Sequence, residues 1–245
     1  MAITYRRNYL LIYFWQSLSI LLGFLSLFVV VPYLSSDKIL FGIYSVCTSL
    51  TIFFSYADLG FVSAGVKYAA EYFIQGNKEK EVKMIGFVAF MMMVMFLIVS
   101  LIIVVCATYP KLLIPELQVG STHFFLARWL LVTLALSCPI IIGQRVLNMI
   151  FTIRVEDYKF QRVSILGSLL KIFSVFYFFR EGAYQLLEYY VFSQVINFLI
   201  VIIALLYIRN YGYKSAKFSY ISKFHIIISC KSIVYIVMCF YQETN

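Results

Sequence analysis

The sequence has few charged residues for its length. Only 13% of its 245 residues are Asp, Glu, Lys or Arg, against about 25% in an ordinary soluble domain. Hydrophobic residues make up 63%, more than one aqueous core can hide, because the surface of a soluble protein must be mostly wetted. This balance excludes a cytosolic enzyme, a secreted disulfide scaffold and a disordered chain, and it predicts an all-α, polytopic membrane protein.

The motifs of common enzyme and metal-site classes are also missing. The two histidines, His123 and His225, stand alone, without the partner at i+4 and the acid that a zinc hydrolase needs. The five cysteines form no C-x-x-C pair, so neither a zinc site nor a disulfide framework is indicated. The segment from Gly60 to Lys67 departs from a P-loop, because a valine separates its second glycine from the lysine. We therefore expect no enzymatic activity and no cofactor.

The net charge of +9 has an explanation that does not involve nucleic acid. Cytoplasmic loops of membrane proteins collect Lys and Arg, and no basic run with interleaved aromatic residues lies outside the apolar segments. We do not expect a nucleic-acid partner.

Apolar segments long enough to cross the roughly 30 Å hydrocarbon core recur along the chain. The third has no charged residue between its ends, whereas the fifth is short and carries a lysine near its middle. The seven predicted spans are Tyr9–Leu34, Leu40–Phe61, Met84–Thr108, Phe124–Gly143, Val163–Phe179, Glu188–Ile208 and Phe224–Tyr241.

The basic residues predict the orientation of these spans. With the N-terminus in the cytoplasm, fourteen of the 20 Lys and Arg lie in inner segments, and only Lys38, Lys111 and Arg180 lie in outer ones. Such an asymmetry is typical of inner-membrane proteins. The outer connections are short, so we expect function to reside within the bundle or at its inner face.

Three ionisable residues inside or beside the spans are candidates for a cavity. A charge at the bilayer centre costs about 2.5–3.5 kcal/mol even on the lenient insertion scale, so such residues tend to face a bundle interior. Lys171 lies near the middle of the fifth span, and a partner on a neighbouring helix is the structural alternative. Asp58 at the inner end of the second span can equally cap a helix or form a salt bridge, and Arg128 in the fourth can snorkel to the headgroups.

Uncharged polar side chains within the spans extend this candidate site. They can line a wet path, or they can form interhelical hydrogen bonds of about 0.6 kcal/mol each. These residues are Gln16, Gln144, Asn148, Gln194 and Asn197.

Several short motifs together resemble one family. The second span opens with Leu40-Phe-Gly-Ile-Tyr44 and leads into Ala57-Asp-Leu-Gly-Phe61, Ser63-Ala-Gly-Val-Lys67 and a hydrophilic loop, Gln75-Gly-Asn-Lys-Glu-Lys80. This order resembles the bacterial polysaccharide and O-antigen flippases of the multidrug/oligosaccharidyl-lipid/polysaccharide exporter superfamily. The Gln144-Arg145 pair and Asn148 are similar in placement, which adds Arg145 to the predicted cavity.

The resemblance implies an architecture of which this chain covers about half. Such flippases look like two six-helix lobes that face each other across a central cavity. Residues 1–208 would form the N-terminal six-helix lobe, residues 209–223 a basic cytoplasmic connector, and residues 224–245 a partial seventh helix. Alternating access needs one bundle to move against another, so the expectation is either a second lobe supplied by a partner or a truncated, inactive copy.

The resemblance also implies a substrate and a location. The expected function is to move undecaprenyl-pyrophosphate-linked oligosaccharide units across the bacterial inner membrane for O-antigen, lipopolysaccharide or capsular polysaccharide synthesis. Lys171 and Arg128 would attract the pyrophosphate, and Asp58 would take part in coupling or gating. Expected partners are this lipid-linked substrate, membrane lipids and other polysaccharide-assembly proteins. A drug or metabolite exporter of the same fold and a membrane enzyme of the same pathway remain the alternatives.

Overall fold

The computed structural model describes residues 2–35, 37–56, 60–115, 117, 121–179 and 185–210. These residues contain no strand, so the predicted all-α class is confirmed for this part of the chain. The helices are α1 (Ala2–Leu34), α2 (Lys38–Tyr56), α3 (Phe61–Ile74), α4 (Lys78–Thr108), the 3-10 turn η1 (Pro110–Leu112), α5 (Thr122–Ile153), α6 (Asp157–Phe178) and α7 (Leu186–Asn210).

Four of these helices have segments long and apolar enough to cross a membrane, namely Arg7–Leu34, Lys78–Thr108, Thr122–Ile153 and Leu186–Ile208. They indicate a helical membrane protein. The apolar part of α2, Lys38–Phe54, is shorter, and α6 carries more polar residues. The predicted connector at 209–223 and the predicted seventh span, Phe224–Tyr241, lie almost wholly outside the described residues.

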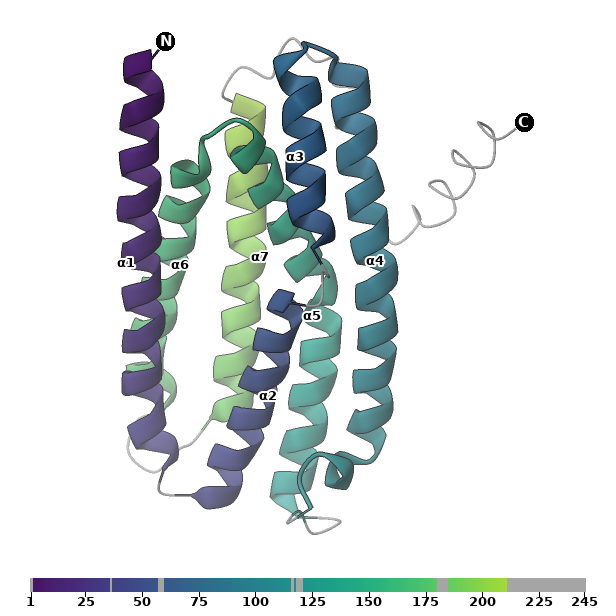
Figure 1. The fold of residues 1–245 in the computed structure, drawn as a ribbon. Coiled ribbons are helices and arrows are strands. Elements are labelled where there is room, and N and C mark those ends of the chain that lie inside the picture. Colours follow the sequence, from purple (N-terminus) through teal and green to yellow (C-terminus); the bar gives the residue numbers. More distant parts are fainter. Residues whose placement is uncertain are drawn as a thin grey trace, which may run out of the picture.

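The helices run up and down between two ends of the molecule (Figure 1). The N-terminus, the α3–α4 connection, the α5–α6 turn and the last turn of α7 share one end, which we call the N-terminal end. The end of α1, the start of α2, the end of α4, the start of α5, the end of α6 and the start of α7 share the opposite, far end. Helix α2 stops midway, and α3 continues toward the N-terminal end beside α4. Because the sequence reads as one span up to Phe61, α3 is an element that the predicted spans did not include.

Helix α5 is the centre of the bundle. It packs against α2, α3, α4, α6 and α7, whereas α1 packs mainly against α6. Large side chains such as Phe54 and Phe96, whose rings stack 5.2 Å apart, fill the core. Other large apolar residues face outward, with Phe28 74% and Leu136 73% exposed. Such exposed apolar surface suits lipid rather than water.

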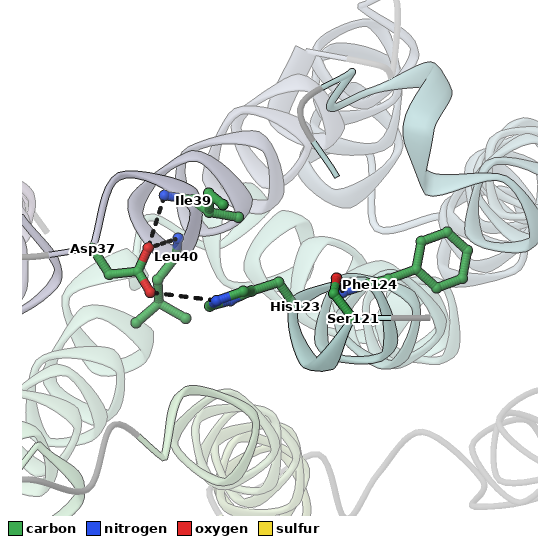
Figure 2. A network of polar contacts seen from close by, with 6 residues as sticks. All are labelled: Asp37, Ile39, Leu40, Ser121, His123 and Phe124. Carbon is green, nitrogen blue, oxygen red and sulfur yellow. Dashed lines mark hydrogen bonds and ion pairs between the residues drawn. The ribbon is translucent and has the colours of Figure 1, made fainter. Parts of the chain in front are cut away.

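Polar side chains mark where helices begin. The side chain of Asn77 accepts a hydrogen bond from the backbone of α4, and Ser121 does the same for α5 through the N–H of Phe124. At the far end, Asp37 Oδ1 accepts from the N–H groups of Ile39 and Leu40, as Figure 2 shows. These side chains replace hydrogen-bond partners that the first turn of a helix lacks.

The same Asp37 joins two helices at the far end. Its second carboxylate oxygen lies 3.6 Å from Nε2 of His123, in the first turn of α5 (Figure 2). The contact links the α1–α2 corner to α5. It gives His123, one of the two histidines of the sequence, a structural role.

Pro139 interrupts the hydrogen bonding of α5 near its middle. Its missing N–H leaves the carbonyl of Ala135 without the usual partner four residues on. The hydroxyl of Ser100, on α4, donates to this carbonyl at 3.3 Å. A neighbouring helix therefore stabilises the break, and the second half of α5 leans toward α6 (Figure 1).

Candidate functional site

A cavity of about 430 Å³ lies among α2, α5, α6 and α7. Its volume falls in the range of small-molecule sites, roughly 300–1,000 Å³. Its wall combines cations, amides and hydroxyls with a few apolar side chains. The lining residues are Thr51, Leu134, Ser137, Ile141, Gln144, Arg145, Asn148, Phe160, Lys171, Gln194 and Asn197.

A hydrogen-bonded network joins three helices across the cavity. The ammonium of Lys171, on α6, donates to Asn197 Oδ1 on α7 at 2.7 Å. Gln144 of α5 donates through Nε2 to the backbone carbonyl of Asn197 at 3.1 Å, and Asn197 Nδ2 donates to Gln194 Oε1 at 3.1 Å. The amides thus orient one another and hold the ammonium at the wall.

A close approach of α6 and α7 brings Lys171 to its partner. Gly167 lies one turn before Lys171 on α6, and a Cβ added there would stand 2.5 Å from Cδ1 of Ile200 on α7. A larger residue would force the side chain of Ile200 to shift. Because residues four apart share a helix face, the contact at Gly167 directs Lys171 toward the same helix.

The cavity is positively charged. Lys171 and Arg145 line it, and no Asp or Glu belongs to the lining residues that the structure describes. The described residues offer Lys171 the amide oxygen of Asn197 and no carboxylate. A partly buried ammonium without a carboxylate partner favours an anion nearby. Asn148 Oδ1 is buried without a hydrogen-bond partner in the described chain, so the wall also offers an acceptor.

The structure brings six of the nine predicted site residues together. The residues that line the one cavity are Lys171, Gln144, Arg145, Asn148, Gln194 and Asn197. Their proximity is a structural finding, and their role in binding a substrate stays a prediction.

The other three residues do not join them. Arg128 is exposed, less than two turns after α5 begins and therefore near the far end of the bundle. Gln16 is exposed on α1, which packs against α6 and contributes no residue to the cavity wall. Neither residue lines this cavity. A polar residue in an apolar segment does not reveal which way its helix face is turned. Asp58 lies outside the described residues.

Thr51, Ser137 and Phe160 line the cavity although the sequence did not point to them. A usable signal existed on α5, where Leu134, Ser137, Ile141, Gln144 and Asn148 recur at intervals of three and four residues. Such spacing places them on one helix face. Thr51 and Phe160 carried no comparable signal.

A second polar cluster lies at the N-terminal end, outside the cavity lining. Glu81 of α4 is buried and pairs with Arg154, at the end of α5, through a 2.6 Å contact between Oε1 and Nη2. The Arg154 guanidinium also lies over the ring of Phe73, on α3, 5.1 Å from its centroid. Close by, burial raises the pKa of Asp157, and a hydrogen bond from Thr152 at 2.6 Å opposes the shift. These contacts connect the end of α5 to α3 and α4.

The described residues contain no group of three or more His, Cys, Asp or Glu side chains that could hold a metal ion. Comparison of the chain with models of protein families, with curated proteins and with solved structures finds no match.

Proposed function

We propose that this chain is one six-span lobe of a transporter for lipid-linked oligosaccharides. The observation that carries the proposal is the cavity among α2, α5, α6 and α7, with Lys171 and Arg145 in its wall and no carboxylate in its described lining. A pyrophosphate is the anion that this chemistry suits best, because both cations can bind phosphate oxygens. The resemblance of the loop and span motifs to the flippase family supports the same substrate.

The neutral part of the wall fits the sugars of such a substrate. Amide groups of Gln144, Asn148 and Gln194 can donate to and accept from sugar hydroxyls, and Phe160 offers an apolar ring face. A cationic drug would instead favour acidic lining residues, so the cavity supports the oligosaccharide transporter over the drug exporter.

The proposal includes an orientation. The N-terminal end, which carries Lys78, Lys80, Lys83, Arg154 and Lys159, would face the cytoplasm, because inner loops of membrane proteins collect basic residues. The membrane would be the bacterial inner membrane, with α2 and α6 completing six spans. A second lobe, from another copy or another protein, would close the cavity and allow alternating access.

Binding of undecaprenyl pyrophosphate to the chain in lipid nanodiscs tests the proposal. We expect Lys171→Gln to weaken this binding about thirtyfold, since a hydrogen bond to a charged group contributes about 2 kcal/mol. Arg128→Gln is the matched control, because it removes a cation of the same bundle that does not line the cavity. We expect it to change binding less than twofold.

Two further measurements separate the proposal from its rivals. Undecaprenyl alcohol, which lacks the pyrophosphate, should bind no more tightly to the native chain than to Lys171→Gln. In cells that depend on this chain for surface polysaccharide, Lys171→Gln should lower the polymer at the surface while the amount of chain in the membrane is unchanged. Equal binding of the pyrophosphate lipid by the native chain and Lys171→Gln would contradict the proposal.

A further inference from the structure

A cation at the seam between α1 and α6 is held by aromatic rings instead of by an acid. The guanidinium of Arg162, on α6, lies 5.0 Å from the ring centroid of Trp15 on α1 and 5.4 Å from that of Tyr158. Arg162 is exposed, and no carboxylate or hydrogen-bond acceptor among the described residues contacts it. Stacking therefore fixes the plane of the guanidinium and leaves its N–H groups available to a ligand.

A second donor stands at the same place. The indole Nε1 of Trp15 is buried and has no hydrogen-bond partner within the described chain. An indole N–H normally finds an acceptor when it is removed from water. Arg162 thus presents a positive charge and several unpaired donors at the surface, which suits an anion with several oxygen atoms, while the indole N–H beside it stays covered by protein.

The nearest acids along α6 are already engaged. Glu156 pairs with Lys159 at 2.7 Å, and the carboxylate of Asp157 accepts from Thr152 at 2.6 Å. Neither forms a contact with Arg162 in the structure. The described acids nearest along α6 therefore supply no counter-charge to Arg162.

The position of the cluster indicates the source of that anion. Arg162 lies between the polar first turn of α6 and the predicted apolar span that begins at Val163, and it is exposed on the outside of the bundle. Tryptophan and tyrosine are enriched where headgroups meet hydrocarbon, and basic side chains at this level attract anionic lipids. None of the three residues lines the central cavity.

We propose that Arg162, Trp15 and Tyr158 form a binding site for the phosphate group of an anionic phospholipid at the α1–α6 seam. The planar guanidinium offers two parallel N–H donors to phosphate oxygens, and the rings of Trp15 and Tyr158 hold it at the seam. The site is independent of the proposed transport function, since it requires only that the chain lies in a membrane.

Quenching of Trp15 fluorescence by brominated lipids tests this site. The chain has two tryptophans, so Trp129→Phe leaves Trp15 as the only source of tryptophan fluorescence. This variant, as a full chain in mixed micelles, is titrated with brominated phosphatidylglycerol and, separately, with brominated phosphatidylcholine. We expect phosphatidylglycerol to quench at more than fivefold lower concentration, because one basic charge near the surface confers about fivefold and the two parallel N–H donors of Arg162 add to it.

Variants in the Trp129→Phe background decide whether Arg162 is responsible. Arg162→Gln should abolish the preference, whereas Lys83→Gln, which removes the same charge from an exposed ion pair at the same end of the bundle, should retain it. Arg162→Lys keeps the charge without the planar guanidinium and should retain only part of the preference for phosphatidylglycerol. If Arg162→Gln does not fold, the lipid preference of Arg162→Lys decides the test.

Three outcomes would overturn the proposal. One is equal quenching by the two lipids, another is an unchanged preference in Arg162→Gln, and the third is an unchanged preference in Arg162→Lys. Excess inorganic phosphate is added in a separate arm and should leave the preference intact. Loss of the preference in that arm would assign the site to free phosphate and exclude the lipid.

Discussion

Val155 adopts a backbone conformation that β-branched residues rarely take. Its φ is +56°, in the left-handed region, and it follows Arg154, the C-cap residue of α5, in the turn to α6. The N–H of Glu156 reaches the carbonyl of Phe151 at 3.0 Å, and that of Val155 reaches Thr152 at 2.9 Å. This pattern is a Schellman motif, in which glycine usually occupies the position that Val155 holds.

We expect Val155→Gly to raise the free energy of unfolding by about 1 kcal/mol, because glycine removes the steric cost of the left-handed conformation. The measurement is thermal or denaturant unfolding of the chain in detergent. Gly76, whose φ is +73° in the α3–α4 connection, provides the opposite control, and Gly76→Ala should lower stability by a similar amount. A loss of stability in Val155→Gly would show that the valine side chain contributes more by packing than its backbone costs.

At the scale of the elements, helices α3, α4 and α5 are fastened at the N-terminal end through one ion pair. The side chain of Glu81 is 3% exposed and that of Arg154 is 16% exposed, and Arg154 also covers the ring of Phe73. A buried ion pair often contributes little net stability compared with apolar residues. Removing one partner alone is costly, because the other charge is then left buried.

Glu81→Ala should therefore lower the free energy of unfolding by about 3–5 kcal/mol, measured by denaturant unfolding in detergent. Glu79, two residues earlier, forms a comparable pair with Lys83 at the surface, where its side chain is 70% exposed. Glu79→Ala should cost less than about 1 kcal/mol. Equal losses in the two variants would mean that burial of the Glu81–Arg154 pair has no energetic consequence.

At the scale of the whole molecule, the connections between consecutive long helices lie alternately at the two ends of the bundle. The α3–α4 and α5–α6 connections share the N-terminal end, and the α4–α5 connection lies at the far end (Figure 1). Basic residues gather in the former connections, so the charge asymmetry of the sequence coincides with the geometry. The proposed orientation follows from this coincidence.

Two cysteine variants test that orientation. Leu112→Cys, at an exposed position of the far end, should react with a membrane-impermeant maleimide in intact cells. Gln75→Cys, exposed in the α3–α4 connection, should react only after the membrane is permeabilised. The parent chain is the background control, and its Cys47 and Cys138 are buried. Labelling of Gln75→Cys in intact cells would reverse the proposed orientation.

The sequence alone predicted the all-helical class and the four helices that are long and apolar enough to cross a membrane. Apolar composition over about 20 residues is a local property, so it can be read without knowing what each helix contacts. The amphipathic helix α3 was not included among the predicted spans. The apolar run from Leu40 continues to Phe61, whereas helix α2 ends at Tyr56 and α3 begins at Phe61.

Only the tertiary structure decided which polar residues share a site. Lys171 reaches Asn197 because Gly167 lets α6 and α7 approach closely, and Gln144 joins them from α5. Arg128 and Gln16, equally polar residues in equally apolar segments, lie outside the cavity. The direction in which a helix face points depends on the packing of its neighbours, and composition along one helix does not contain that information.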